Sequence, residues 1–228
     1  MRVSAWVRAV VDLSPVAPQA LGALTSDGLV PAFVNGADQL DTSEIAAHLD
    51  VLGTVGAGPG GSELANAMAS ALTASDPTLV QLVSSLRHIL PLVVSRVPVT
   101  ARGLTVAGDA SLSALGSRLT LVFDGPARAE LRLEEDGTAA GWSAAVPADL
   151  LPKVGRYGVR ALVEGVEGTF PVVTARMPLP PLDDRYPLQP LADRKDGCRF
   201  IVDRRASRRG LSELAARLRA TLRHGGGR

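Results

Sequence analysis

Charged residues alternate with small or apolar ones along Arg128-Ala129-Glu130-Leu131-Arg132-Leu133, and this pattern indicates the type of fold. Successive side chains of a β-strand point to opposite faces, so the alternation predicts a strand with one face in a core and the other in solvent. The next residues, Glu135-Asp136-Gly137-Thr138, contain the Asp-Gly pair that is typical of a tight hairpin turn. We therefore expect an antiparallel, half-exposed strand here.

Similar short strands are predicted on both sides of this one, each bounded by Gly, Pro, Asp or Ser. Their spacing, with no helical pattern between them, favours an immunoglobulin-like antiparallel β-sandwich over residues 97–176. The Cys-Trp-Cys framework of antibody domains is absent, since Cys198 is the chain's one cysteine. Besides 127–133, the predicted strands are 104–107, 118–123, 141–146, 157–163 and 169–174, with a further one at 198–202.

Residues 1–96 are expected to form a helical region instead. Four N-caps are expected to begin helices: Ser14, Asp41, Ser62 and Asp76. Ser14 and Asp76 are each followed by proline, which is favoured at the first helical position. Gly53 is expected to end the helix that Asp41 begins. A further short helix is predicted over 19–24, ending near Gly28.

Residues 177–228 are predicted to be a Pro-rich linker, one strand and a basic C-terminal amphipathic helix. We expect the arginines to bind an anionic polymer or membrane surface, and the leucine stripe to face a membrane or a partner helix. Docking of the stripe on the protein's own core and dimerisation are the alternatives. The arginines are Arg204, Arg205, Arg208 and Arg209, and the leucines are Leu211, Leu214, Leu218 and Leu222.

Charge is unevenly distributed along the 228 residues. Residues 1–193 carry 13 Lys and Arg against 20 Asp and Glu, whereas residues 194–228 carry 11 against 3. Hydrophobic residues make up 46% of the chain, which excludes a disordered protein, and aromatic residues only 4%, so aromatic ligand platforms are few. Because no aromatic residue except Phe200 is interleaved with the basic cluster, nucleic acid is not an expected partner.

No cofactor or metal site is predicted. The glycines at 56, 58 and 61 have dinucleotide-loop spacing, but a helix rather than a strand is expected before them, so an interhelix loop is favoured. Cys198 lies on an expected strand and is interpreted as a packing residue. The sequence contains neither the Gly-x-Ser-x-Gly motif of α/β-hydrolases nor the Gly-Lys-Ser/Thr motif of phosphate-binding loops.

Residues 141–151, with Trp142 and the Val146-Pro147 turn, followed by 155–161 with Tyr157, resemble a sandwich module of actinobacterial cell-envelope transferases of teichoic-acid type. The stretches 186–191 and 197–200 are similar to the segment that closes such modules, although Cys198 replaces their usual small or Asn residue. The resemblance covers at most residues 97–202 and implies an accessory role. Trp142 and Tyr157 are candidates for stacking on a ligand, with packing in the core as the alternative.

Three functions follow as hypotheses. The first is a non-catalytic accessory module that binds an envelope glycan or phosphate polymer beside a transferase. The second is a small transferase with a site between the helical region and the sandwich, and the third is a structural oligomerisation module. No apolar leader follows Arg2, so we expect a cytoplasmic protein, peripheral to the inner membrane face, with a protein partner or a second copy of itself.

Overall fold

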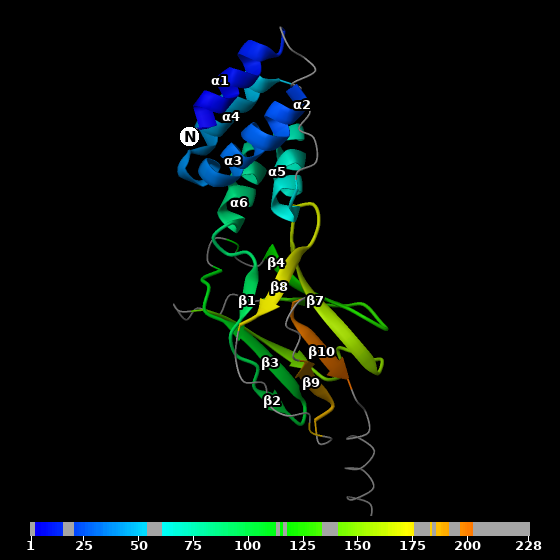
Figure 1. Ribbon diagram of the computed structural model, residues 1–228. Helices are drawn as coiled ribbons and strands as arrows, with labels where there is room; N and C mark the ends of the chain where they lie inside the picture. The colour runs from blue at the N-terminus through cyan, green and yellow to red at the C-terminus, as the bar shows by residue number, and fades with distance from the viewer. Residues whose placement is uncertain are drawn as a thin grey trace, which may run out of the picture. The chain divides into compact units, whose positions relative to one another are not determined.

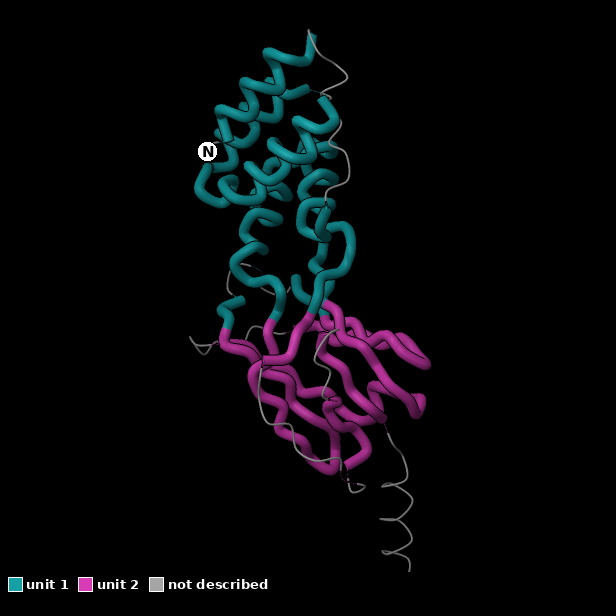
Figure 2. Tube along the Cα trace, in the orientation of Figure 1, with its two compact units in different colours: residues 1–92, 110–120, 161–171 teal, residues 93–109, 121–160, 172–228 magenta. Residues whose placement is uncertain are grey.

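The computed structural model describes residues 3–15, 21–53, 61–112, 115, 118–133, 141–175, 183, 186–191 and 197–202. The chain divides into two compact units, each built from three segments (Figure 2). The first unit holds residues 1–92, 110–120 and 161–171, and the second holds 93–109, 121–160 and 172–228. The chain is thus of mixed α and β type with two sheets. The finer immunoglobulin-like assignment stays a prediction.

Helices make up the N-terminal part of the first unit (Figure 1). They are α1 (Val3–Leu13), α2 (Leu21–Leu24), the π-helical turn η2 (Thr25–Leu29), α3 (Val30–Gly36), the 3-10 turn η3 (Ala37–Gln39), α4 (Thr42–Leu52), α5 (Glu63–Thr73) and α6 (Pro77–Leu86). Their shared core is apolar and closed to solvent, with Val10, Phe33, Ile45, Met68 and Val83 all fully buried.

Three of the four predicted N-caps are confirmed, and Ser14 is wrong, because it follows the last residue of α1 and its amide donates to the Val10 carbonyl at 3.0 Å. Asp41 accepts a hydrogen bond from the Glu44 amide at 2.8 Å and completes a capping box, while Ser62 caps α5 and Asp76 caps α6. Gly53 ends α4 with a positive φ of 57°. These boundaries agree because a cap depends on a few neighbouring residues, which the sequence shows directly.

The predicted end of a helix near Gly28 is wrong. Among the described residues, helical structure continues from Leu21 through η2 and α3 to Gly36. Gly28 is a contact point rather than a stop, since a side chain there would overlap the ring of Trp6 from α1. The helices α1 and α3 were not predicted from the sequence.

The strands belong to two sheets, of seven and three strands. The order of the larger sheet is β1-β8-β7-β10-β9, with β4 pairing with both β7 and β5, and that of the smaller sheet is β2-β3-β6. The strands are β1 (Leu92–Val94), β2 (Val99–Thr100), β3 (Gly103–Gly108), β4 (Leu119–Asp124), β5 (Ala129–Arg132), β6 (Trp142–Pro147), β7 (Gly155–Val163), β8 (Phe170–Thr174), β9 (Leu188–Leu191) and β10 (Arg199–Val202).

All seven predicted strands are present. They could be predicted because apolar and polar residues alternate along them, and this alternation is visible in the sequence. Along β7, for example, Tyr157, Val159, Ala161 and Val163 are buried and the residues between them are not. The smaller sheet pairs β3 with β6 antiparallel, with Leu104 opposite Val146 and Gly108 opposite Trp142. The predicted Asp-Gly turn lies outside the described residues.

Part of the predicted Pro-rich linker is in fact a strand. β9 pairs antiparallel with β10, and Pro190 stands opposite Phe200. A proline cannot donate to a sheet ladder, so it is tolerated at a sheet edge, and β9 is the last strand in its sheet's order. The short strands β1 and β2 were also missed. In the part of the chain that is described, we find no helix with the length and apolar character needed to cross a bilayer.

Candidate functional site

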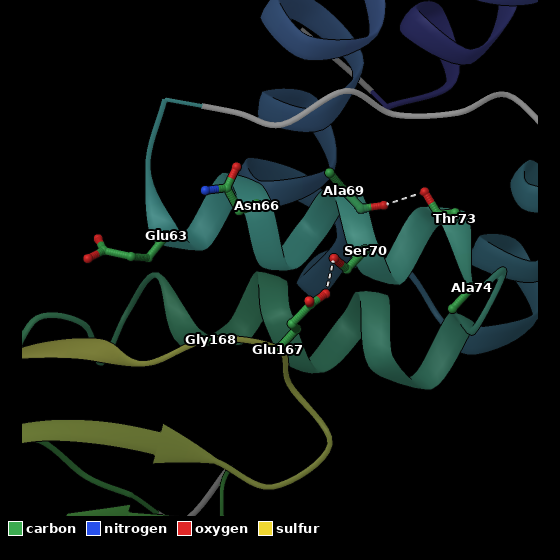
Figure 3. A pocket seen from close by; sticks show the side chains of 8 residues that line it. All are labelled: Glu63, Asn66, Ala69, Ser70, Thr73, Ala74, Glu167 and Gly168. Carbon is green, nitrogen blue, oxygen red and sulfur yellow. Dashed lines mark hydrogen bonds between the residues drawn. The ribbon is translucent and has the colours of Figure 1, made fainter. Parts of the chain in front are cut away.

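A groove of about 650 Å³ lies in the first unit, between α5 and the turn that joins β7 to β8. Figure 3 shows the side chains along it. We call it the α5 groove. Its described lining residues are Glu63, Asn66, Ala69, Ser70, Thr73, Ala74, Glu167 and Gly168.

The polar side of the groove is one face of α5. Glu63, Asn66, Ser70 and Thr73 follow one another at spacings of three and four residues, which places them in a stripe along the helix. The opposite face packs into the helical core through Ala67, Met68, Ala71 and Leu72. The burial of that apolar face fixes the direction in which the polar stripe points.

Glu167 reaches the groove from the turn between β7 and β8. Gly165 and Gly168 flank it with φ values of 84° and 94°, a region that residues with a Cβ seldom adopt. Between them Val166 is buried and anchors the turn. The Ser70 hydroxyl donates a hydrogen bond of 2.6 Å to Glu167 Oε2. Glu167 is therefore held in place although its side chain is exposed.

Some polar side chains of the groove can still form hydrogen bonds with a ligand. Among the described residues, neither Glu167 Oε1 nor the Asn66 side-chain amide has a hydrogen-bond partner. The Thr73 hydroxyl donates to the Ala69 carbonyl at 2.9 Å and keeps its own oxygen as an acceptor. The described lining carries two carboxylates and no basic side chain. Such a surface favours ligands that donate hydrogen bonds, such as hydroxyl or ammonium groups.

A second polar cluster joins η3 to the end of α6. Asp38 forms an ion pair with Arg87 at 3.1 Å, contacts His88 Nε2 at 2.9 Å and accepts from the buried Ser84 hydroxyl at 3.1 Å. Desolvation by burial raises the pKa of Asp38, but the hydrogen bonds from His88 and Ser84 and the charge of Arg87 outweigh it and hold the pKa below the ordinary 3.8. We interpret this cluster as a structural link between η3 and α6 rather than a ligand site, because its polar groups bond to one another.

We expect Asp38→Asn to destabilise the first unit near neutral pH. A carboxyl with a depressed pKa in the folded state adds stability above its ordinary pKa, and this stability is lost as the pH falls through the lower, folded value. The unfolding free energies of the wild-type protein and of Asp38→Asn should therefore converge as the pH falls below about 3.8. Urea unfolding from pH 7 to pH 2.5 measures this, with Asp50→Asn as the charge-matched control. A difference that stays constant over this range would contradict the assignment.

The two aromatic residues proposed for stacking are both in the core. Trp142 is 5% exposed and Tyr157 is fully buried, with its hydroxyl donating to the Lys153 carbonyl at 2.8 Å. Burial of both rings favours the packing role over stacking on a ligand. The basic residues Arg204, Arg205, Arg208 and Arg209, and the stripe of Leu211, Leu214, Leu218 and Leu222, lie outside the described residues, so their binding roles stay proposals.

The remaining sequence-based expectations concern cofactors and nucleophiles. Burial raises the pKa of the Cys198 thiol to about 11, which fits a packing residue. The described residues include no His, Cys, Asp and Glu group that could hold a metal ion. Residues 54–60 of the glycine-rich loop are not described, but the elements on either side are the helices α4 and α5, as the interhelix interpretation requires.

Sequence reasoning did not find the α5 groove. The polar stripe on α5 is visible as a pattern, but such a stripe is usually just a solvated helix face. What distinguishes it is Glu167, which lies 97 residues from its partner Ser70. No local signal connects two positions so far apart.

No protein-family model matches the chain, and no curated protein is significantly similar to it. Among solved structures, the chain is weakly similar to residues 217–571 of TarS from S. aureus, with a TM-score of 0.40 and 8% identity over 88% of this chain and 75% of that one. A second structure of S. aureus TarS matches with a TM-score of 0.36 and 9% identity, over 88% of this chain and 47% of that one.

Proposed function

We propose that the chain is a non-catalytic accessory module that works beside a cell-envelope transferase and binds a hydroxyl-bearing part of an envelope glycan. The transferase association rests on the sequence resemblance around Trp142, Val146-Pro147 and Tyr157. The observation that carries the binding role is the α5 groove. In it, Glu167 and Asn66 retain hydrogen-bonding capacity beside the Ser70 and Thr73 hydroxyls of the polar stripe.

The arrangement of the groove suits recognition. Sugar hydroxyls both donate and accept hydrogen bonds, so they are best met by a mixture of carboxylate, amide and hydroxyl groups. Ser70 uses its proton to fix Glu167, which pre-positions an acceptor before any ligand arrives. The exposed Ala74 supplies apolar surface for the carbon skeleton of a ring.

Asn66→Ala is expected to weaken the binding of gluco-oligosaccharides about two- to twelvefold, since a hydrogen bond contributes on the order of 0.5–1.5 kcal/mol. Titration of the ¹⁵N-labelled protein, followed by NMR, measures the affinity and reports whether amide signals of α5 move. Asn35→Ala is the matched control, because Asn35 is an exposed asparagine on α3, away from the groove lining. Equal affinities for the wild-type protein and Asn66→Ala would contradict the proposal.

The competing transferase hypothesis is tested on the same protein. Incubation with CDP-glycerol or a sugar nucleotide, in the presence of the oligosaccharide, should release no nucleotide if the module only binds. Nucleotide release that is abolished in Glu167→Gln would replace the accessory role by a catalytic one, with Glu167 accepting the proton of an acceptor hydroxyl.

A further inference from the structure

We infer that the α5 groove selects its ligand by charge and favours a sugar unit bearing an ammonium group over a neutral one, and a neutral one over a phosphorylated one. This inference rests on the proposed glycan-binding role and names the ligand class more narrowly.

The two carboxylates of the groove come from different elements. Glu63 stands in the first turn of α5, and Glu167 stands on the turn between β7 and β8, so the two residues belong to separate parts of the unit. No lysine, arginine or histidine is among the described residues that line the groove. A phosphate group beside Glu167 would therefore meet like charge.

Glu167 gives this charge a fixed position. Its flanking glycines and the buried Val166 set the turn, and the 2.6 Å bond from Ser70 occupies one carboxylate oxygen. The second oxygen keeps its capacity to accept from a ligand. A charged acceptor that is already ordered loses little conformational entropy when it binds, and charge-assisted hydrogen bonds are the stronger ones.

The polar groups beside the two carboxylates favour an ammonium-bearing sugar over a simple cation as the ligand. The Asn66 amide and the Thr73 oxygen continue the hydrogen-bonding surface along α5 beyond the carboxylates. A ligand that fills a groove of about 650 Å³ and uses these groups must carry several hydroxyls beside its ammonium group. Amino sugars have this combination.

The test uses three ligands that share one ring: glucosamine, glucose and glucose 6-phosphate. Their affinities are measured by NMR titration of the ¹⁵N-labelled full chain at a pH of about 6, where the amine is protonated. We expect glucosamine to bind about two- to fivefold more tightly than glucose, because charge pairs at exposed sites contribute modestly. Glucose 6-phosphate should bind most weakly, and the differences should shrink at high salt.

Glu167→Gln should remove most of the advantage of glucosamine over glucose, so that the ratio of the two affinities falls towards one. Asp50→Asn, which makes the same change in net charge on α4, should leave the order of the three ligands unchanged. Circular dichroism confirms that both variants are folded.

The outcomes separate the two proposals. Equal binding of the three sugars at α5, or tightest binding of glucose 6-phosphate, overturns the charge selection and leaves glycan binding standing. If none of the three sugars and no gluco-oligosaccharide shifts the amide signals of α5, both proposals fail. Selection that persists in Glu167→Gln overturns the role assigned to that carboxylate.

Discussion

Replacing Phe200 by alanine should lower the free energy of unfolding of the second unit by about 3–5 kcal/mol. Phe200 is fully buried on β10, which lies between β7 and β9, and its ring centroid is 6.1 Å from that of Phe123 on β4. Truncation removes buried apolar surface, loses this aromatic contact and leaves a cavity that a sheet backbone fills poorly.

Thermal unfolding followed by circular dichroism measures this effect. Ile201→Ala is the control, because the Ile201 side chain is only half-buried and points to the other face of the strand. Phe200→Leu should fall between the wild-type protein and Phe200→Ala. A loss in Phe200→Ala no larger than that in Ile201→Ala would show that the core of this unit is not centred on the aromatic pair.

Gly108→Ala should destabilise the same unit by about 1–3 kcal/mol or more. A methyl group at this position would overlap the indole of Trp142 on one side and the Val93 carbonyl oxygen on the other. The Trp142 ring therefore lies close against this backbone, and its Nε1 atom is buried without a hydrogen-bond partner among the described residues. Relief would require a shift of the paired strands β3 and β6.

Gly158→Ala is the matched control for this clash. Gly158 also lies in a strand, but a Cβ there would approach the nearest atom, the Asp124 carbonyl oxygen, at 3.9 Å, an ordinary contact. We expect little change in the melting temperature of Gly158→Ala and a marked fall in that of Gly108→Ala. Similar melting temperatures would mean that Trp142 can move away at small cost.

The α5 groove illustrates which part of a site a sequence reveals. The polar stripe on α5 can be read from the sequence, because its spacing and its Ser62 cap are local features. The functional candidates chosen from the sequence were instead aromatic residues, basic residues and a stripe of leucines. Trp142 and Tyr157 proved to be buried, since a large ring on a sheet face contributes more by leaving water than by facing it.

Local features of this chain can be predicted from its sequence alone. Asp41, Ser62 and Asp76 begin helices and the alternation along β5 and β7 marks strands, because caps and side-chain periodicity depend only on nearby residues. Contacts that exist only in the folded chain explain why Gly28 continues a helix beneath Trp6, why Pro190 joins a sheet edge and why Ser70 holds Glu167. Trp6 and Glu167 lie far along the chain from Gly28 and Ser70, and their approach is set by the burial of apolar surface elsewhere.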